Sequence, residues 1–401
     1  MMKILMLVCD GMADRPIEDF GGKTPLEVSM KENMDAIAAR GICGIMDPIA
    51  PGVRVGSDTT HLALLGYDPY MYYTGRGPFE ALGAGLEVRK GDVAFRVNFA
   101  TVDEDMVVKD RRAGRINKGT ADLAQAVNEI SLPGVDFVFK ESTGHRGALV
   151  FRGDHLSSKV SDSDPHEIGK KIMEVKPLDG SRDATRTADL ANEFIRKSHE
   201  VLKRHRVNEE RRAKGLKPAN MLLLRGCGVA MDIPYFEEKY GITGSCMTTT
   251  GLIKGIARSV GLELVETPEG YRDRVMTAQK VLEEKDFLLL NIKEPDEAAH
   301  DMNPERKIEL IEAIDEALAP LVDFVEENYM VLLSDHTTSS SYGDHTGDPV
   351  PIIIAGPEVR VDDIKTFDER KAAKGGLGRI RGRDIMQIML DLLNKSEKFG
   401  A

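Results

Sequence analysis

Short, unbroken runs of apolar residues alternate with amphipathic stretches along much of this 401-residue chain. The apolar runs that begin at Lys3, Phe287 and Met330 have the length of strands, and such continuous runs are typical of strands buried on both faces of a parallel sheet. Residues 25–40 and 304–327 instead place their apolar side chains at helical spacing, which predicts helices. The alternation predicts an α/β fold, with a mostly parallel sheet flanked by helices.

The pattern changes between residues 73 and 187, where short strand-like segments such as Val93–Phe99 are joined by glycine-rich, charged connections. We predict a smaller inserted α+β domain at 73–187. The larger domain is then discontinuous and comprises residues 1–72 and 188–401. A long helix with a highly charged end is predicted over residues 187–214, at the start of the second segment.

Composition excludes several classes of partner. The formal net charge of -12 argues against nucleic acid or an anionic membrane as the main partner. The four cysteines lie far apart and form no C-x-x-C pair, so neither a disulfide framework nor a thiolate zinc site is expected. The N-terminal apolar run stops at Asp10 without a cleavage site, and no stretch approaches the ~20 apolar residues of a membrane span. We therefore expect a soluble, cytoplasmic protein.

Carboxylates and imidazoles follow the ends of three predicted strands. These residues are Asp10, after the first strand; Asp296 and His300, after the second; and Asp335, His336 and His345, after the third. In open α/β sheets, ligands bind just beyond the carboxyl ends of the strands. Mixed oxygen and nitrogen donors without thiolate suit Mn²⁺, Mg²⁺, Co²⁺ or Zn²⁺. Each residue alone could be a turn residue, a helix cap or a structural histidine, but their recurrence at three strand ends favours a metal site.

Ser57 has two possible roles. It follows Gly56, precedes a helical pattern and begins a Ser-x-x-Thr sequence, which fits a helix N-cap. Alternatively, its hydroxyl is a nucleophile at a helix N-terminus, where backbone N–H groups and the helix dipole favour an incoming phosphate. The local pattern leaves both roles open.

Basic residues are dense in the predicted insert, although the chain as a whole is acidic. They are Arg76, Arg96, Lys109, Arg111, Arg112, Arg115, Lys118, Lys140, His145 and Arg146. Most basic runs are solvated faces. Two clusters of these basic residues, in the segments KDRRAGR and STGHRGALVFRG, nevertheless fit an anion-binding surface.

Three segments of the chain resemble motifs of the alkaline phosphatase superfamily: GSDTTHLALLGYDP, KEPDEAAH and LLSDHTTSSSYGDHTGDPVP. With ESTGHRGALVFRG, VAFRVNFATVD and GRIRGRDIM, essentially the whole chain resembles the archaeal type of cofactor-independent phosphoglycerate mutases. The resemblance implies an isomerase of glycolysis and gluconeogenesis that interconverts 3-phosphoglycerate and 2-phosphoglycerate. It also implies a phosphoserine intermediate and no need for 2,3-bisphosphoglycerate.

The resemblance further implies two divalent ions and a role for each motif residue. One ion would be held by Asp296, His300 and His345, and the other by Asp10, Asp335, His336 and the oxygen of Ser57. The Ser57-x-x-x-His61 spacing matches that of the bacterial enzymes and favours Ser57 over Thr59 or Thr60 as the nucleophile. The resemblance also makes the inserted domain at 73–187 a substrate-binding lid. The best matches for substrate-binding residues are Arg111, Arg115, His145, Arg146 and Lys254.

Two other functions compete with this interpretation. A metal-dependent phosphomonoesterase or phosphotransferase would use the same metal core on another small phosphorylated metabolite. Such a hydrolase needs access for water, whereas a mutase needs an arginine-lined lid. A non-catalytic metal-binding protein is the second alternative, and the intact ligand set together with Ser57 argues against it. The ligand types accept several ions, so they do not select the native metal.

Overall fold

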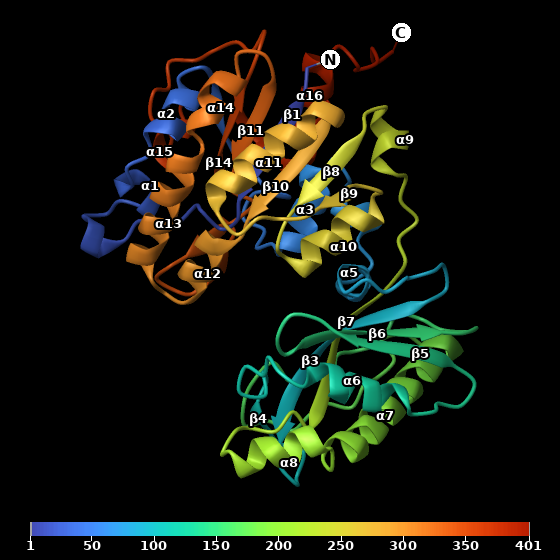
Figure 1. The fold of residues 1–401 in the computed structure, drawn as a ribbon. Helices are drawn as coiled ribbons and strands as arrows, with labels where there is room; N and C mark the ends of the chain where they lie inside the picture. The colour runs from blue at the N-terminus through green and yellow to red at the C-terminus, as the bar shows by residue number, and fades with distance from the viewer. Residues whose placement is uncertain (1, 401) are drawn as a thin grey trace. The chain divides into compact units, whose positions relative to one another are not determined.

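The structure is a computed structural model that describes residues 2–400, and it divides into two compact units (Figure 1). The first unit comprises Met1–Tyr72 and Ile233–Ala401, and the second comprises Tyr73–Asp232. The insert thus begins at the expected residue, 73, but it extends to residue 232 instead of 187.

The first unit is built on an eight-stranded sheet. Across the sheet, the strands are β15 (Gly378–Arg381), β2 (Gly41–Asp47), β14 (Val350–Ala355), β11 (Tyr329–Leu333), β1 (Ile4–Cys9), β10 (Phe287–Ile292), β8 (Gly244–Met247) and β9 (Glu263–Val265). Only β14 is antiparallel to its neighbours, so the other strands share one direction. Every residue of β1, β10, β11 and β14 is buried, as continuous apolar runs predict. The predicted α/β class with a mostly parallel sheet is confirmed.

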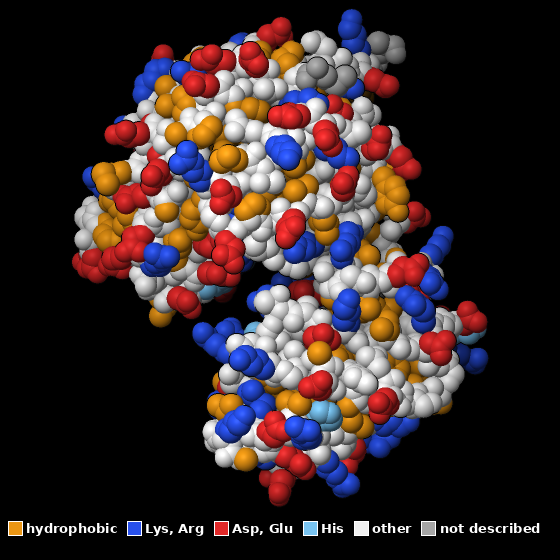
Figure 2. All heavy atoms as spheres, in the orientation of Figure 1, with side chains coloured by type: hydrophobic (Ala, Val, Ile, Leu, Met, Phe, Trp, Pro, Cys, Tyr) orange, Lys and Arg blue, Asp and Glu red, His pale blue; other side chains and the backbone are white. Residues whose placement is uncertain are grey.

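Helices flank this sheet (Figure 1). They are α1 (Pro25–Val28), α2 (Glu32–Ala38), α3 (Ser57–Leu64), α4 (Pro69–Tyr72), α9 (Phe236–Tyr240), α10 (Gly251–Ser259), α11 (Tyr271–Glu284), α12 (Glu294–His300), α13 (Pro304–Ala317), α14 (Ala319–Phe324), α15 (Glu369–Ala372) and α16 (Ile385–Leu392). Among the described residues, no helix is both long enough and apolar enough to cross a membrane. On the face drawn in Figure 2, acidic and basic side chains are mixed over the first unit.

The predicted helices over 25–40 and 304–327 are each interrupted. Between α1 and α2, Ser29 is extended and its Oγ donates a hydrogen bond to the carbonyl oxygen of Pro25. Between α13 and α14, Pro320 follows the break at Leu318, and proline has no N–H with which to continue the helical hydrogen bonds. The apolar periodicity continues through both breaks, which is why the pattern alone predicts single helices.

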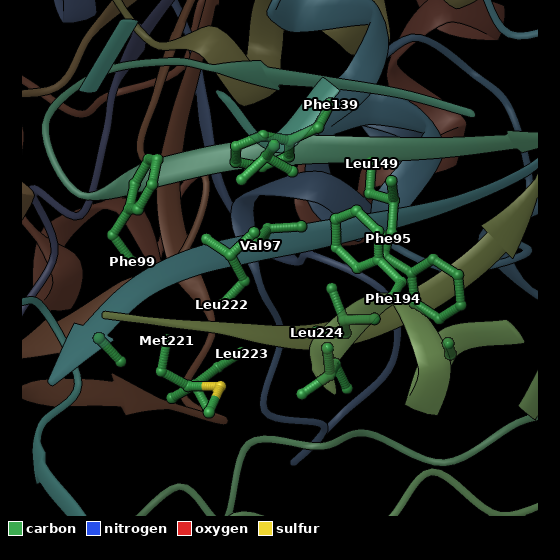
Figure 3. Packing of buried hydrophobic residues seen from close by; sticks show 14 of the residues in the cluster. Phe95, Val97, Phe99, Phe139, Leu149, Phe194, Met221, Leu222, Leu223 and Leu224 are labelled. Carbon is green, nitrogen blue, oxygen red and sulfur yellow. The ribbon is translucent and has the colours of Figure 1, made fainter. Parts of the chain in front are cut away.

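The second unit is an antiparallel sheet covered by helices. Its strands are β3 (Val93–Val102), β4 (Val108–Asp110), β5 (Asp136–Glu141), β6 (Arg146–Arg152) and β7 (Met221–Val229), and its helices are α5 (Gly77–Gly83), α6 (Thr120–Asn128), α7 (Arg182–Leu202) and α8 (Arg206–Ala213). Figure 3 shows the apolar side chains that fill its core, and the ring centroids of Phe95 and Phe151 lie 5.7 Å apart. This architecture agrees with the expected α+β insert.

The second boundary was misplaced because α7 and β7 complete the core of the insert. Phe194 of α7 packs edge-to-face against Phe137, with ring centroids 5.2 Å apart, and β7 pairs along β3. The predicted helix over 187–214 is in fact two helices, and His205 caps the second by accepting a hydrogen bond from the Val207 N–H. An amphipathic pattern identifies a buried face, but it does not identify the sheet that the face covers.

Candidate active site

The candidate site lies beyond the carboxyl ends of three adjacent strands, β11, β1 and β10. Asp10 directly follows β1, and Asp296 lies on α12, which directly follows β10. Asp335 and His336 follow β11, and a short hairpin of β12 (Thr337–Ser339) and β13 (Asp344–Thr346) then supplies His345. The order of the strands therefore brings together residues that are far apart in the sequence.

The first group of potential metal ligands comprises Asp296, His300 and His345, whose donor atoms lie within 4.8 Å of one another. The Nδ1–H of His300 donates to the carbonyl oxygen of Gly343 at 2.7 Å, and that of His345 donates to the carbonyl oxygen of Val55 at 2.7 Å. Both Nε2 atoms therefore face Asp296, at 3.3 and 3.5 Å from its carboxylate oxygens. A backbone partner on Nδ1 is what orients a metal-binding imidazole.

The second group comprises Asp10, Asp335 and His336, all buried, with donor atoms likewise within 4.8 Å of one another. The His336 Nε2 lies 3.3 Å from the Asp335 carboxylate and 3.5 Å from that of Asp10. Burial and the neighbouring charge of Asp10 raise the pKa of Asp335 well above its usual value. One oxygen of Asp335, Oδ2, is buried and has no hydrogen-bond partner in the described part of the chain.

Thr338 links the two groups. Its hydroxyl donates a hydrogen bond of 2.7 Å to the Asp296 Oδ1 and lies 3.0 Å from the His336 Nδ1. A hydroxyl has one proton, so its oxygen accepts the Nδ1–H of His336. The Nε2 of His336 is then unprotonated, which is the form that binds a metal.

Lys293 also contacts both groups, although no pattern in the sequence singles it out. Its ammonium donates to the Asp10 Oδ1 at 3.1 Å and to the Asp296 Oδ2. Burial alone would lower the pKa of Lys293, but the charges of Asp10 and Asp296 raise it. The ammonium therefore stays protonated between the two carboxylates.

Ser57 lies beside the second group and is not a helix N-cap. Gly56 occupies the N-cap position, and Ser57 is the first residue of α3. The Ser57 Oγ lies 3.2 Å from the His336 Nε2, whereas the Thr59 hydroxyl donates to the carbonyl oxygen of Gly56. One turn on, His61 is fully buried and donates from Nδ1 to the carbonyl oxygen of Ser57 at 2.8 Å. Of the hydroxyls considered as nucleophiles, that of Ser57 is the one in contact with a candidate ligand.

The chain is similar to known proteins along its whole length. A curated relative from Methanothermobacter thermautotrophicus, named 2,3-bisphosphoglycerate-independent phosphoglycerate mutase 1, is 50% identical, and the alignment covers 100% of both chains. A relative of the same name from Archaeoglobus fulgidus is also 50% identical over 100% of both chains. The chain belongs to the 2,3-bisphosphoglycerate-independent phosphoglycerate mutase family. A family model with this description also matches residues 38–208.

Two solved structures extend the similarity to the fold of this mutase family. A protein from Pyrococcus horikoshii superposes with a TM-score of 0.87 and 39% identity, over 100% of this chain and 99% of that one. A cofactor-independent phosphoglycerate mutase from Thermoplasma acidophilum has a TM-score of 0.73 and 38% identity, over 98% of this chain and 100% of that one.

Membership of the mutase family implies dependence on metal, and the residues present fit divalent ions. Each group of ligands combines carboxylate oxygen with imidazole nitrogen, the donor types that Mn²⁺, Co²⁺ and Zn²⁺ accept. The Oδ2 of buried Asp335 accepts no hydrogen bond from the residues that the structure describes, and a buried carboxylate oxygen without a donor is costly unless a cation binds it.

The residues that the mutase resemblance nominates for substrate binding differ in their availability. The guanidinium of Arg111 already forms two hydrogen bonds with Asp164, at 3.0 and 2.6 Å. Arg115 and Arg146 are exposed. Burial and neighbouring arginines lower the pKa of His145 to about 4, so its imidazole is neutral near pH 7. Lys254 is half-buried on α10, in the first unit.

The insert also contains three arginines with buried or half-buried side chains, Arg76, Arg96 and Arg225, which the sequence alone did not single out as a group. The Nε of Arg96 lies 3.6 Å from Glu80 and that of Arg76 lies 2.8 Å from it, while Arg225 is 3.6 Å from Asp164. Burial and the charge of Arg76 lower the pKa of Arg96 to about 9, and its Nε has no hydrogen-bond partner among the described residues. The signal in the sequence was an arginine within the mostly apolar strand VAFRVNF.

Proposed function

We propose that the chain interconverts 3-phosphoglycerate and 2-phosphoglycerate through a phosphoserine at Ser57, independently of 2,3-bisphosphoglycerate. The observation that carries the proposal is the position of the Ser57 Oγ, 3.2 Å from the His336 Nε2 and at the first residue of α3. Free N–H groups and the helix dipole at such a position favour a phosphoryl group. The substrate is thus a small phosphorylated acid, and the reaction is a cytoplasmic step of glycolysis and gluconeogenesis.

Two divalent ions would complete the site. Asp296, His300 and His345 would hold one, and Asp10, Asp335, His336 and the oxygen of Ser57 would hold the other. When bound, ions such as Mn²⁺, Mg²⁺, Co²⁺ or Zn²⁺ would lower the pKa of the serine hydroxyl and offset the charge of the phosphoryl oxygens. Thr338 and the two backbone carbonyls that accept from His300 and His345 orient the imidazoles for this task.

The proposed reaction is a pair of phosphoryl transfers. The Ser57 oxygen attacks the phosphorus of 3-phosphoglycerate, and the bond from phosphorus to the 3-oxygen breaks. The glycerate then turns without leaving, and its 2-hydroxyl takes the phosphoryl group back from the serine. Water must be excluded between the two transfers, because the phosphoserine would otherwise hydrolyse.

The insert supplies groups that suit the glycerate carboxylate. Arginine binds carboxylates with two parallel hydrogen bonds, and Arg115 and Arg146 have exposed guanidinium groups. Near neutral pH, His145 would act as a neutral hydrogen-bond partner because its pKa is about 4. Arg111 would have to share its guanidinium with Asp164, and Lys254 is the candidate phosphate ligand on the first unit.

The test is a coupled enolase assay on 3-phosphoglycerate with metal-stripped protein reconstituted with Mn²⁺. The assay contains no 2,3-bisphosphoglycerate, and release of free phosphate is followed in parallel. Isomerisation without phosphate release is the expected result. Phosphate release without isomerisation would favour the phosphomonoesterase alternative.

Ser57→Ala tests the covalent step. This variant should lose activity while keeping its fold and metal content, whereas Thr59→Ala, in which the lost hydroxyl only caps a backbone carbonyl, should keep most of its turnover. In acid-quenched wild-type protein, peptide mass spectrometry should find phosphate on the segment that contains Ser57. Turnover retained by Ser57→Ala would refute the covalent step.

A further inference from the structure

Lys293 connects the two groups of metal ligands through one ammonium. It directly follows β10 and occupies the N-cap position of α12. Its Nζ donates to the Asp10 Oδ1 at 3.1 Å and also to the Asp296 Oδ2. Asp10 belongs to one group of ligands and Asp296 to the other, so the same cation contacts a carboxylate of each.

The contacted oxygens also face imidazoles of the two groups: the Asp10 Oδ1 lies 3.5 Å from the His336 Nε2, and the Asp296 Oδ2 lies 3.3 Å from the His300 Nε2. Both carboxylates are buried, with side-chain exposures of 0% and 1%, and a carboxylate in such a position is stable only when it is paired with a cation. The side chain of Lys293 is 21% exposed, so part of it is in contact with solvent. Of the three side chains, that of Lys293 is therefore the one with access to solvent.

We propose that Lys293 is an internal counter-cation that competes with divalent ions for Asp10 and Asp296 and thereby sets the metal affinity of the site. The inference rests on the proposed metal centre. Entry of the ions displaces the ammonium from at least one carboxylate, because an ammonium and a metal cannot share an oxygen at short range without strong repulsion. Lys293 weakens metal binding, and in return it keeps the carboxylates paired until the metals arrive.

The test compares Lys293→Met, which removes the charge but keeps the length of the side chain, with the matched control Lys3→Met. Lys3 directly precedes β1, pairs with Asp286 at 3.4 Å and has a side-chain exposure of 20%, but it contacts neither group of ligands. Mn²⁺ affinity is measured by isothermal titration calorimetry on metal-stripped full-length protein. The melting temperature of each metal-stripped protein is measured by circular dichroism.

Lys293→Met should bind Mn²⁺ at least ~10-fold more tightly, because one unit charge at ~4 Å contributes this much or more at the effective dielectric of a protein. The same variant should melt at a lower temperature without metal, since its buried carboxylates lose their partner. Lys293→Arg, which keeps the charge, and Lys3→Met should both bind Mn²⁺ like the wild type. Unchanged or weaker binding by Lys293→Met would overturn the inference and leave the metal centre standing. A wild-type protein that binds no divalent ion would overturn both.

Discussion

Replacing Thr338 with valine would test whether the Thr338 hydroxyl positions the two groups of candidate metal ligands relative to each other. Valine has nearly the shape of threonine, so the substitution removes two hydrogen bonds without opening a cavity. The lost bonds are the donation to the Asp296 Oδ1 at 2.7 Å and the contact with the His336 Nδ1 at 3.0 Å. Thr338, Asp296 and His336 are all buried, so water does not replace the lost partner.

The expected loss follows from these two bonds. A hydrogen bond to a charged carboxylate contributes about 1.5–3 kcal/mol, and a buried N–H left without an acceptor costs about 1–3 kcal/mol. Part of this loss falls equally on the metal-free and metal-bound forms and does not affect binding. The remainder should weaken metal binding about 10- to 100-fold, the effect usually found when a residue that orients a metal ligand is removed. This loss corresponds to about 1.4–2.8 kcal/mol of binding free energy.

The assay is a Mn²⁺ titration of the metal-stripped variant by calorimetry, combined with turnover at saturating metal. Thr338→Ser is the matched control, because it keeps the hydroxyl and loses only a methyl group, and it should bind Mn²⁺ as the wild type does. If Thr338→Val binds Mn²⁺ within about 2-fold of the wild-type affinity, the positioning role of the Thr338 hydroxyl is refuted, since a 2-fold change corresponds to only about 0.4 kcal/mol.

Two further predictions concern stability. The buried ammonium of Lys307 donates to Asp14 at 2.8 Å and to the carbonyl oxygen of Ala13 at 3.1 Å, so Lys307→Met should lower the unfolding free energy by about 3–5 kcal/mol. Scanning calorimetry would measure this loss, and recovery in Asp14→Asn/Lys307→Met would attribute it to the unpaired carboxylate. Burial raises the pKa of Glu369 from 4.5 to about 7, so the folded state holds a proton that the unfolded state releases. The contribution of Glu369 to stability is therefore complete below pH 4.5 and is lost as pH rises through about 7. Melting curves of Glu369→Gln should lack this part of the pH dependence, and an unchanged pH profile would contradict the assignment.

The central strands and the candidate ligands at their ends could be predicted from the sequence for the same physical reason. A strand buried on both faces has to be apolar throughout, so a carboxylate or imidazole directly after it stands out, as Asp10 and Asp335 do. Lys293 and Thr338 carry no such signal. Their roles depend on which strands are neighbours, because each contacts residues from distant segments of the chain. The same limit explains the misplaced boundary, since the apolar stripe of α7 does not reveal which sheet it covers.

The sequence did not show which basic residues of the insert are the best candidates for substrate binding. In the sequence, a lysine or arginine beside a glycine turn gives the same pattern whether its side chain is solvated or bound to a carboxylate. Only the structure shows that Arg111 is paired with Asp164. Likewise, the lowered pKa of His145 arises from burial acting together with the charges of Arg146 and Arg112. The residue types show that the insert can bind anions, but they do not show which of its basic side chains are charged and unpaired.

The reversed direction of β14 has a consequence for the order in which the protein folds. Because β14 is antiparallel to β11, the chain between them turns back at the same edge of the sheet and needs no crossover helix. The loop that carries Asp335, His336 and His345 is therefore local and forms quickly once β11 and β14 pair. Asp10 and Asp296 join these residues only when β1 and β10 pair with β11, and we expect this long-range pairing to be the slower step. A divalent ion present during refolding would thus bind late, and it should slow unfolding more than it speeds folding.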